Sequence, residues 1–370
     1  MNVLSIGTDR KIFEKGSAVR KRMIDYGTLF PELHIIVFAL KSQGFQTEKI
    51  SENVTVYSTQ SSSRWAYIFD AITLGKHILS DKKAWVLTAQ DPFETGLVGA
   101  RLKKIFGVPL QIQIHTDFLS PYFRAHSFLN RLRVFVAGYT LPKADRIRVV
   151  SERIKNSLKA YTLKNEPQVL PIYVDREKII DTPISTDLKQ KYPQFTQHIL
   201  MASRLTSEKN ISFALQIFKK VLEQHPQTGL IIVGSGPAEW SLKEEVRKFN
   251  IEKSVIFEPW QHDIISYYKT ATLFLTTSVY EGYGMTLIEA ALSRCPIVTS
   301  DVGIAGSLLP KDTIAICSAS DDTCFVEAIS RLVQSEDKRK ESADRAFEAA
   351  KSASLTHEKY LEMYRKLLIP

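Results

Sequence analysis

The sequence predicts an α/β protein built from two lobes, each a doubly wound parallel sheet, and three observations support this. Short runs rich in β-branched residues alternate with longer stretches of helical spacing along the whole chain. The alternation restarts after a segment punctuated by Pro167, Pro171, Pro183 and Pro193. The 370 residues also exceed the size at which one hydrophobic core stops growing, about 250 to 300 residues. We therefore expect two lobes that face a central cleft, where a ligand would bind.

The first half of the chain contains five short apolar runs that we expect to be strands. Each run is followed by a stretch of helical spacing, and this alternation is typical of a parallel sheet covered by helices. The runs are VLSIG (3–7), HIIVFAL (34–40), AWVLTA (84–89), PLQIQIH (109–115) and RIRVV (146–150).

The second half repeats the alternation with six more runs, so we expect a second sheet of the same kind. The apolar spacing of the stretch 355–368 predicts an added terminal helix. We expect an N-terminal lobe over 1–175, a C-terminal lobe over 176–354, and a terminal helix over 355–370 that returns to the first lobe. The six runs are HILMAS (198–203), LIIVG (230–234), SVIFE (254–258), TLFLTT (272–277), CPIVTS (295–300) and TIAIC (313–317).

The composition excludes several classes of protein. Hydrophobic residues make up 44% and charged residues 24% of the chain, as in ordinary globular proteins rather than disordered or collagen-like ones. No apolar run reaches the length of about 18 residues that a membrane-spanning helix needs. Cys295, Cys317 and Cys324 include no close C-x-x-C pair, so we expect neither a disulfide framework nor a zinc site. This cysteine usage favours a reducing compartment, the cytoplasm.

The net charge of +9 is concentrated in one region, because residues 96–170 contain 13 Lys and Arg against 4 Asp and Glu. Such a region can attract nucleic acid, anionic lipid or a phosphorylated substrate, or it can be a solvated surface. Within it, the segment 121–141 mixes Phe and Leu with Arg124, Arg131 and Arg133. This pattern fits a helix that lies on an anionic membrane, and it also fits a core helix of a basic lobe.

The strongest functional pattern is Glu281-Gly-Tyr-Gly-Met-Thr-Leu-Ile-Glu289, which follows an expected strand and opens an expected helix. Gly282 and Gly284 would let backbone amides approach an anion at the start of that helix. The two carboxylates could then contact one elongated ligand. From two glutamates alone, a helix cap and an exposed helical glutamate explain the pattern as well.

Four segments, in order, are similar to the retaining glycosyltransferases of family 4 (glycosyl transferases group 1), which have the two-lobed GT-B fold. The segment MASRLTSEKNISFALQIFKKV (201–221) resembles the strand, loop and helix in which an Arg and a Lys, five positions apart, bind the donor diphosphate. The segments VGSGP (233–237) and SVIFEPW (254–260) resemble the next two landmarks. The segment SVYEGYGMTLIEAALSRCPIVTSDVG (278–303) resembles the E-x7-E block. The resemblance is close over 198–304 and loose in the first lobe.

The resemblance implies that the second lobe binds the donor. Arg204 and Lys209 would bind the diphosphate of a nucleotide sugar, a task that suits a guanidinium fork and an ammonium. Glu281 would lie near the hydroxyls of the donor sugar, and Glu289 would accept hydrogen bonds from the ribose. The remaining donor-binding candidates in these segments are Gly234, Trp260, Gly282, Tyr283, Gly284, Met285 and Thr286.

The first lobe contributes further candidates. His115 follows an expected strand, and many relatives have a His there that contacts the donor sugar, so we place it in the catalytic site. A lone His is otherwise more often structural. Asp117 could orient His115 or face an acceptor. Gly16 lies in a loop that resembles the glycine-bearing loop of the family, although the usual paired glycine is absent.

We therefore predict a GT-B enzyme of polysaccharide biosynthesis, a retaining hexosyltransferase that moves a sugar from a UDP-sugar to a hydroxyl of a lipid-linked or cell-surface glycan precursor. We expect no metal and no other cofactor, because no Asp-x-Asp occurs and Arg204 and Lys209 would replace a divalent cation. We expect no nucleic-acid partner, and a cytoplasmic protein that is free or bound at the inner face of the membrane through 96–170. The alternatives are a GT-B sugar-nucleotide epimerase, a phosphorylase, or a non-catalytic protein that binds sugar or nucleic acid.

Overall fold

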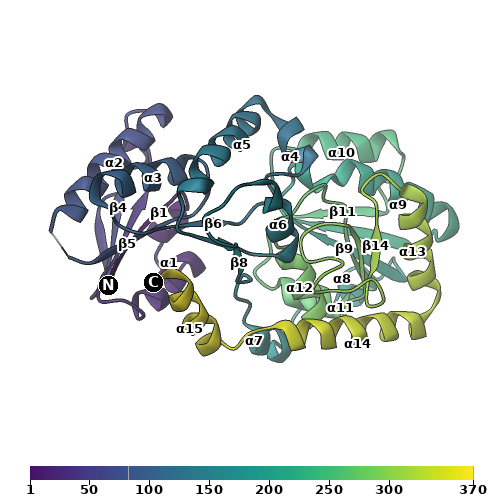
Figure 1. Ribbon diagram of the computed structural model, residues 1–370. Helices are drawn as coiled ribbons and strands as arrows, with labels where there is room; N and C mark the ends of the chain where they lie inside the picture. The colour runs from purple at the N-terminus through teal and green to yellow at the C-terminus, as the bar shows by residue number, and fades with distance from the viewer. Residues whose placement is uncertain (82, 370) are drawn as a thin grey trace. The chain divides into compact units, whose positions relative to one another are not determined.

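The computed structural model describes residues 1–81 and 83–369 (Figure 1). It divides into two compact units: unit 1 comprises Met1–Pro171 with His357–Pro370, and unit 2 comprises Ile172–Thr356. Each unit contains one sheet flanked by helices, and every neighbouring strand pair but one is parallel. The predicted class, two doubly wound α/β sheets, is confirmed.

The sheet of unit 1 has eight strands in the order β3-β4-β2-β1-β5-β6-β7-β8, and only β3 and β4 pair antiparallel. All five predicted strands are present. The strands β3, β4 and β8 were not predicted, because β3 is polar (EKIS), β4 (VTVYS) alternates apolar and polar residues instead of forming a continuous apolar run, and β8 has only two residues. The strands are β1 Asn2–Gly7, β2 Leu33–Val37, β3 Glu48–Ser51, β4 Val54–Ser58, β5 Trp85–Ala89, β6 Leu110–Ile114, β7 Arg146–Val149 and β8 Gln168–Val169.

The helices of unit 1 lie on both faces of its sheet, with α2 and α3 on one face and α1 and α15 on the other (Figure 1). The helix α15 packs on unit 1 through buried tyrosines: the Tyr360 hydroxyl lies 2.9 Å from the Tyr26 hydroxyl and accepts a hydrogen bond from Arg148 at 3.0 Å. The helices are α1 Ala18–Gly27, α2 Tyr67–Ile78, α3 Glu94–Phe106, α4 Pro121–His126, α5 Phe128–Thr140, α6 Glu152–Ser157 and α15 His357–Leu368.

The sheet of unit 2 has six parallel strands in the order β11-β10-β9-β12-β13-β14, and all six predicted runs form them. The order turns back at β9, whose neighbours are β10 on one side and β12 on the other. In open α/β sheets, ligands bind at the carboxyl ends of the strands where the order reverses. The strands are β9 Gln197–Ala202, β10 Thr228–Val233, β11 Val255–Glu258, β12 Leu273–Thr276, β13 Ile297–Ser300 and β14 Ala315–Cys317.

One core layer of unit 2 lies between one face of its sheet and the helices α9, α10 and α13. Phe218 of α9 and Phe325 of α13 are fully buried there, beside Leu230 and Leu275 of the sheet. Burial of these side chains is the main force that holds the strand ends in place. The helices are α7 Arg176–Asp181, α8 Leu188–Lys191, α9 Ile211–Gln224, α10 Glu239–Lys248, α11 Ile264–Thr270, α12 Met285–Leu292, α13 Asp322–Gln334 and α14 Glu336–Ala353.

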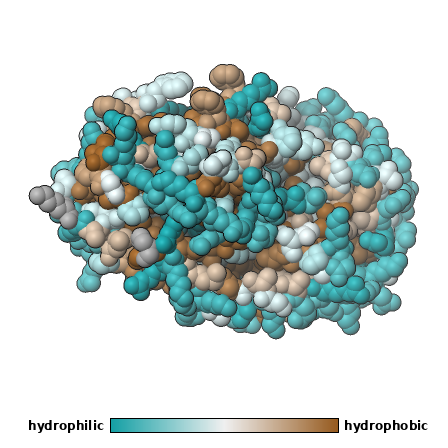
Figure 2. Space-filling model, viewed as in Figure 1, coloured by the Kyte–Doolittle hydropathy of each residue, from teal (hydrophilic) through white to brown (hydrophobic). Residues whose placement is uncertain are grey.

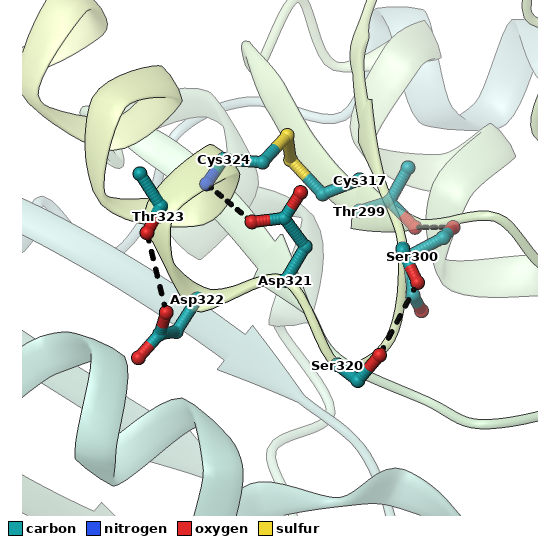
Figure 3. Close-up of a disulfide and its surroundings, with 9 residues drawn as sticks. Thr299, Ser300, Cys317, Ser320, Asp321, Asp322, Thr323 and Cys324 are labelled. Atoms are coloured by element: carbon teal, nitrogen blue, oxygen red, sulfur yellow. Dashed lines mark hydrogen bonds between the residues drawn. A yellow bond between two sulfur atoms is a disulfide. The ribbon is translucent and has the colours of Figure 1, made fainter.

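The expectation that the cysteines form no disulfide is wrong. Cys317, the last residue of β14, is bonded to Cys324 in the first turn of α13 (Figure 3). The turn between them reverses the chain and brings the two Cα atoms within 5.8 Å, while the Asp321 carboxylate caps α13 by accepting a hydrogen bond from the Cys324 backbone. Cys295 is a buried free thiol. The cysteines therefore no longer support a reducing compartment.

Candidate active site

The loop after β9 carries Arg204 and Lys209. The chain leaves β9 at Ala202 and forms the short 3₁₀ helix η7 (Ser207–Lys209), and α9 begins after Asn210, whose φ of 51° is left-handed. This corner places Lys209 at the carboxyl end of the sheet. The Arg204 side chain is 74% exposed, and its guanidinium lies 3.2 Å from Oε1 of Glu208. Arg204 is therefore accessible to a ligand.

The structure brings Lys209 together with Glu281, which comes from the loop after β12. The Lys209 ammonium lies 2.5 Å from Oε1 of Glu281, and the two side chains are only 15% and 19% exposed. The Ser278 hydroxyl donates a hydrogen bond to the same carboxylate oxygen at 2.8 Å. A partly buried ion pair with a third polar partner is better fixed than an exposed one.

Backbone contacts join the two loops that carry this pair. The Thr277 hydroxyl donates hydrogen bonds to the carbonyl oxygens of Lys209 and Asn210, at 3.1 and 3.0 Å. The Val279 backbone amide donates to the carbonyl oxygen of Glu208 at 2.9 Å. The loops after β9 and β12 are thus hydrogen-bonded to each other at the carboxyl edge of the sheet, because the two strands are neighbours and end at this edge.

A glycine turn follows Glu281 and opens α12. Gly284 has a φ of 86° and precedes Met285 and Thr286, and as the N-cap residue it offers this helix start no capping side chain. The N-terminus of a helix presents backbone amides and the positive end of the helix dipole, which favours anions. The turn therefore gives the edge of the sheet an anion-binding character.

Gly303 in the loop after β13 supports this turn. Its φ is 55°, and a Cβ there would lie 2.3 Å from the carbonyl oxygen of Tyr283. The Ile304 amide donates to that same oxygen at 2.9 Å. Only a glycine allows this close backbone approach, so Gly303 helps to fix the shape of the Gly282–Gly284 turn.

Gly234 occupies an equally tight position at the end of β10. Its φ is 143°, and a Cβ would lie 1.9 Å from the carbonyl oxygen of Ser203, the residue before Arg204. Gly236 lies similarly close to the Leu205 backbone, where a Cβ would be 2.3 Å from the carbonyl oxygen. The VGSGP segment thus packs directly against the Arg204 loop.

Glu289 lies on α12, about one turn after the helix begins at Met285. Burial raises its pKa to about 7, although a hydrogen bond from the Tyr268 hydroxyl, at 3.5 Å, acts in the opposite direction. A carboxyl group with this pKa gains or loses its proton near neutral pH. Perturbed carboxyl groups of this kind are common at functional sites.

Glu208 is a candidate site residue that the sequence did not single out. Its burial alone would raise its pKa, but the hydrogen bond from Thr206 (2.7 Å) and the nearby charges of Arg204 and Lys209 lower it overall. Glu208 therefore remains ionised and holds Arg204. Its position between the predicted Arg and Lys was the only available signal.

Unit 1 presents His115 just beyond the carboxyl end of β6. Burial and the charges of Arg148 and Arg22 lower its pKa to about 3, so the imidazole is neutral at ordinary pH. Its Nε2 is buried and has no hydrogen-bond partner among the described residues. Burial also raises the pKa of Asp117. A buried ring nitrogen without a partner is unusual in a folded protein and indicates a place for a ligand atom or water.

The remaining predicted residues are more dispersed. Gly16 has a φ of 82° and lies exposed in unit 1, before Ser17 caps α1. Trp260 is exposed in the loop after β11. Tyr283 is buried in the glycine turn. Within unit 2 the structure thus joins Lys209, Glu281 and their loops directly, and it puts Trp260 at the end of another strand of the same sheet.

No group of three or more His, Cys, Asp or Glu side chains within 1–81 and 83–369 is arranged to hold a metal ion. The cationic side chains Arg204 and Lys209 and the start of α12 lie at the carboxyl edge of the unit 2 sheet. Phosphate groups are bound by guanidinium, ammonium and backbone amides of this kind. The fold and this edge define an α/β protein whose strand ends carry the groups that suit a phosphorylated ligand.

Comparisons with known proteins identify the class more closely. Residues 187–350 match the family model of glycosyl transferases group 1, and residues 32–178 match that of glycosyltransferase family 4. The chain belongs to this family of glycosyltransferases, which use nucleotide sugars. The resemblance recognised in the sequence is therefore confirmed.

Two curated relatives extend the comparison. The chain is 28% identical over 225 residues to alpha-monoglucosyldiacylglycerol synthase of Streptococcus pneumoniae, covering 58% of this chain and 51% of the synthase. It is 26% identical over 304 residues to the amylovoran biosynthesis glycosyltransferase AmsD of Erwinia amylovora, covering 81% of each. The alignment thus spans about half the length of the synthase and most of AmsD.

A solved structure confirms the GT-B type of fold. Anabaena HepE, solved in complex with UDP, superposes with a TM-score of 0.77 at 18% identity over 99% of both chains. Identity this low supports the fold alone.

Proposed function

We propose that this glycosyltransferase transfers a hexose from a UDP-sugar to a hydroxyl of a lipid-linked or cell-surface glycan precursor, with retention of configuration and without a metal. The observation that carries the proposal is the Lys209–Glu281 pair at 2.5 Å, beside the glycine turn that opens α12. The pair unites a cation for the diphosphate and a carboxylate for the sugar in one place.

Each cation of the site is held by a carboxylate, Lys209 by Glu281 and Arg204 by Glu208. A donor diphosphate carries about two to three negative charges and would share or take over these cations. Arg204 and Lys209 would then neutralise the diphosphate as the bond to the sugar breaks. This stabilisation is larger in the transition state than in the ground state, which is what accelerates the reaction.

In the proposed reaction the bond between the anomeric carbon and the diphosphate oxygen breaks, and the acceptor oxygen bonds to the same face of that carbon. The acceptor proton passes to the departing diphosphate oxygen, so no protein base is needed. Glu281 would orient the sugar hydroxyls. Glu289 would accept hydrogen bonds from the ribose hydroxyls once it is ionised, and the neutral His115 would contact the sugar.

The choice of UDP and of the acceptor rests on the named relatives. HepE was solved with UDP, one relative is named for a glucosylated diacylglycerol, and AmsD is named for amylovoran biosynthesis. These names favour a uridine nucleotide and an acceptor that is a lipid or a precursor of a surface polysaccharide. Contact with an anionic membrane through 96–170 would bring the enzyme to such an acceptor. No helix in the described part of the chain is long and apolar enough to cross a membrane.

The test is a product analysis with labelled UDP-glucose, UDP-galactose, UDP-N-acetylglucosamine, GDP-mannose and ADP-glucose. Each donor is offered with diacylglycerol in mixed micelles and with a polyprenyl-diphosphate-linked sugar. We expect transfer from one UDP-sugar and an α-linked product, identified by nuclear magnetic resonance. A β-linked product would contradict retention of configuration. An epimerised sugar, or a sugar phosphate released by phosphorolysis, would show that the enzyme catalyses one of the alternative reactions instead of transfer. Full activity after extensive chelation is expected.

A further inference from the structure

The helix α5 of unit 1 has an apolar stripe that faces away from the protein. Phe128 is 81% exposed and Phe135 is 77% exposed, and Leu132 and Tyr139 lie exposed beside them. At 100° per residue, these four positions fall within about 60° of the helix circumference. Of the three residues that α5 buries, Asn130 and Ala137 belong to its opposite side and Thr140 lies on its flank.

This pattern differs from that of an ordinary surface helix, whose outer face is polar. Single exposed apolar side chains are normal on a protein surface, whereas contiguous exposed apolar patches are rare. A row of exposed aromatic rings therefore indicates a surface that contacts a partner. Figure 2 shows hydrophobic side chains that reach the surface in the region where Figure 1 draws α5, among hydrophilic ones.

The charged residues of the segment that carries the stripe are all positive. The segment 121–143 contains Arg124, Arg131, Arg133 and Lys143 and no Asp or Glu. Arg133 is paired with Glu94 of α3, whereas Arg124 and Arg131 are exposed beside the stripe. The Lys143 ammonium lies 4.1 Å from the centre of the Tyr139 ring, at the end of the stripe.

We propose that this α5 stripe (Phe128, Leu132, Phe135 and Tyr139) inserts into the headgroup region of an anionic lipid bilayer, with Arg124, Arg131 and Lys143 on the phosphates. The inference deepens the proposed membrane contact and rests on it. The proposed contact is then not only an electrostatic attraction of the region 96–170 to the membrane, because the apolar face of α5 is also buried in lipid. Aromatic rings with flanking cations suit this boundary, because the rings leave water while the cations stay near phosphate.

A bilayer explains the stripe better than a second copy of the chain does. Two copies that met through this face would bring their Arg124, Arg131 and Lys143 side chains together without an acidic residue of 121–143 to neutralise them. An anionic lipid surface instead supplies negative charge next to an apolar interior. Insertion of a 13-residue helix parallel to the surface also needs no membrane-spanning length.

The test is co-sedimentation of the full chain with vesicles of phosphatidylcholine, with or without phosphatidylglycerol. We expect binding to the anionic vesicles, part of which persists at about 1 M salt, where the Debye length is about 3 Å. Each Phe→Ser change should lower the partition coefficient about tenfold, so F128S/F135S should lose on the order of a hundredfold. R124Q/R131Q should weaken binding only at low salt.

The matched control is W65S, since Trp65 of unit 1 is 94% exposed but lies outside the stripe. W65S should bind vesicles like the wild type. Equal binding of F128S/F135S and wild type would overturn the proposal, as would a wild-type dimer that becomes monomeric in F128S/F135S. All variants should keep the thermal midpoint and the UDP affinity of the wild type. If the wild-type chain transfers sugar but does not bind vesicles, the proposed role of the α5 stripe is wrong and the proposed reaction is unaffected.

Discussion

The ammonium of Lys209 lies 2.5 Å from a carboxylate oxygen of Glu281, although 72 positions separate the two residues in the sequence. They meet because β9 and β12 are neighbours in the sheet of unit 2 and the loops after them leave at the same edge. The contact is also supported by Ser278, which donates to the same oxygen. Charge and carboxylate are therefore in place before any ligand binds.

Lys209→Ala should lower kcat at least about a hundredfold, because the loss of one charged group that stabilises a departing anion costs this much or more. The remaining Glu281 keeps the Ser278 hydroxyl and some contact with water, so the variant should fold. Steady-state kinetics with the donor found by product analysis measure the effect. The control is Lys243→Ala, which removes a lysine from an exposed pair with Glu239 in the same unit. Comparable kcat values for the two variants would contradict the role of Lys209.

Glu289 should make the ligand-free protein less stable as pH rises. Its folded pKa of about 7 lies above the ordinary value of 4.5, so the native state binds the proton more tightly than the unfolded state does. The free energy of unfolding should therefore fall between about pH 4.5 and 7, by an amount on the order of 3 kcal/mol, and stay level above pH 7. Glu289→Gln should remove this slope in urea titrations across pH. If Glu289→Gln kept the wild-type dependence of the free energy of unfolding on pH, another titratable group would have to cause that dependence.

The same carboxyl group should make UDP binding depend on pH. If the ribose hydroxyls donate to the ionised Glu289, affinity should rise as pH increases toward 7 and then level off. Calorimetric titration of UDP at several pH values measures this, with Glu289→Gln as a variant of reduced affinity and little pH dependence. A wild-type affinity that falls over this range would contradict the assigned contact.

Gly303→Ala should disturb the glycine turn more than Gly306→Ala does. Both glycines have a left-handed backbone, with φ of 55° and 77°, so both variants lose about 1 kcal/mol of stability. Only at Gly303 would the new Cβ also meet a backbone oxygen, that of Tyr283, which brings the loss to about 3 kcal/mol. Urea unfolding should separate the two variants, and only Gly303→Ala should weaken UDP binding. Equal losses would mean that the loop adjusts without moving the turn.

Reduction of the Cys317–Cys324 disulfide should lower the stability of the chain by about 2 kcal/mol, because the bond closes a short loop between β14 and α13. A reductant should lower the thermal midpoint of the wild type and leave that of C317S/C324S unchanged. Mass spectrometry after alkylation should find one reactive thiol per unfolded, unreduced chain, that of Cys295. Three alkylated thiols would show that the bond is absent from the purified protein.

The sequence predicted the regular parts of the fold well, because buried parallel strands are nearly continuous apolar runs. LIIVG and TLFLTT, for example, lie in β10 and β12 with almost every side chain buried. The strand β3 (Glu48–Ser51) has no such run, since it is partly exposed and owes its pairing to β4. Pairing that depends on a neighbour leaves no signal in the strand itself.

Only part of the candidate site could be identified from the sequence. The resemblance to glycosyl transferases group 1 pointed to Arg204, Lys209, Glu281 and Glu289, and parallel topology brings the loops of Lys209 and Glu281 together. The spacing of residues along the chain did not reveal that the backbone of Gly303 lies close to the Tyr283 carbonyl group, because this contact depends on the path of two loops. It also did not reveal the disulfide, since a separation of seven residues becomes a bond only when a strand end and a helix start face each other.

The central claim is that Lys209 and Glu289 of unit 2 bind the nucleoside diphosphate of one nucleotide sugar. Calorimetric titration of UDP, GDP and ADP into the wild type, Lys209→Ala, Glu289→Gln and Lys243→Ala tests it most directly. We predict preferential binding of UDP at pH 8, at least about tenfold weaker in Lys209→Ala and Glu289→Gln and unchanged in Lys243→Ala. UDP binding of equal strength in all four proteins, or its absence from the folded wild type, would contradict the claim.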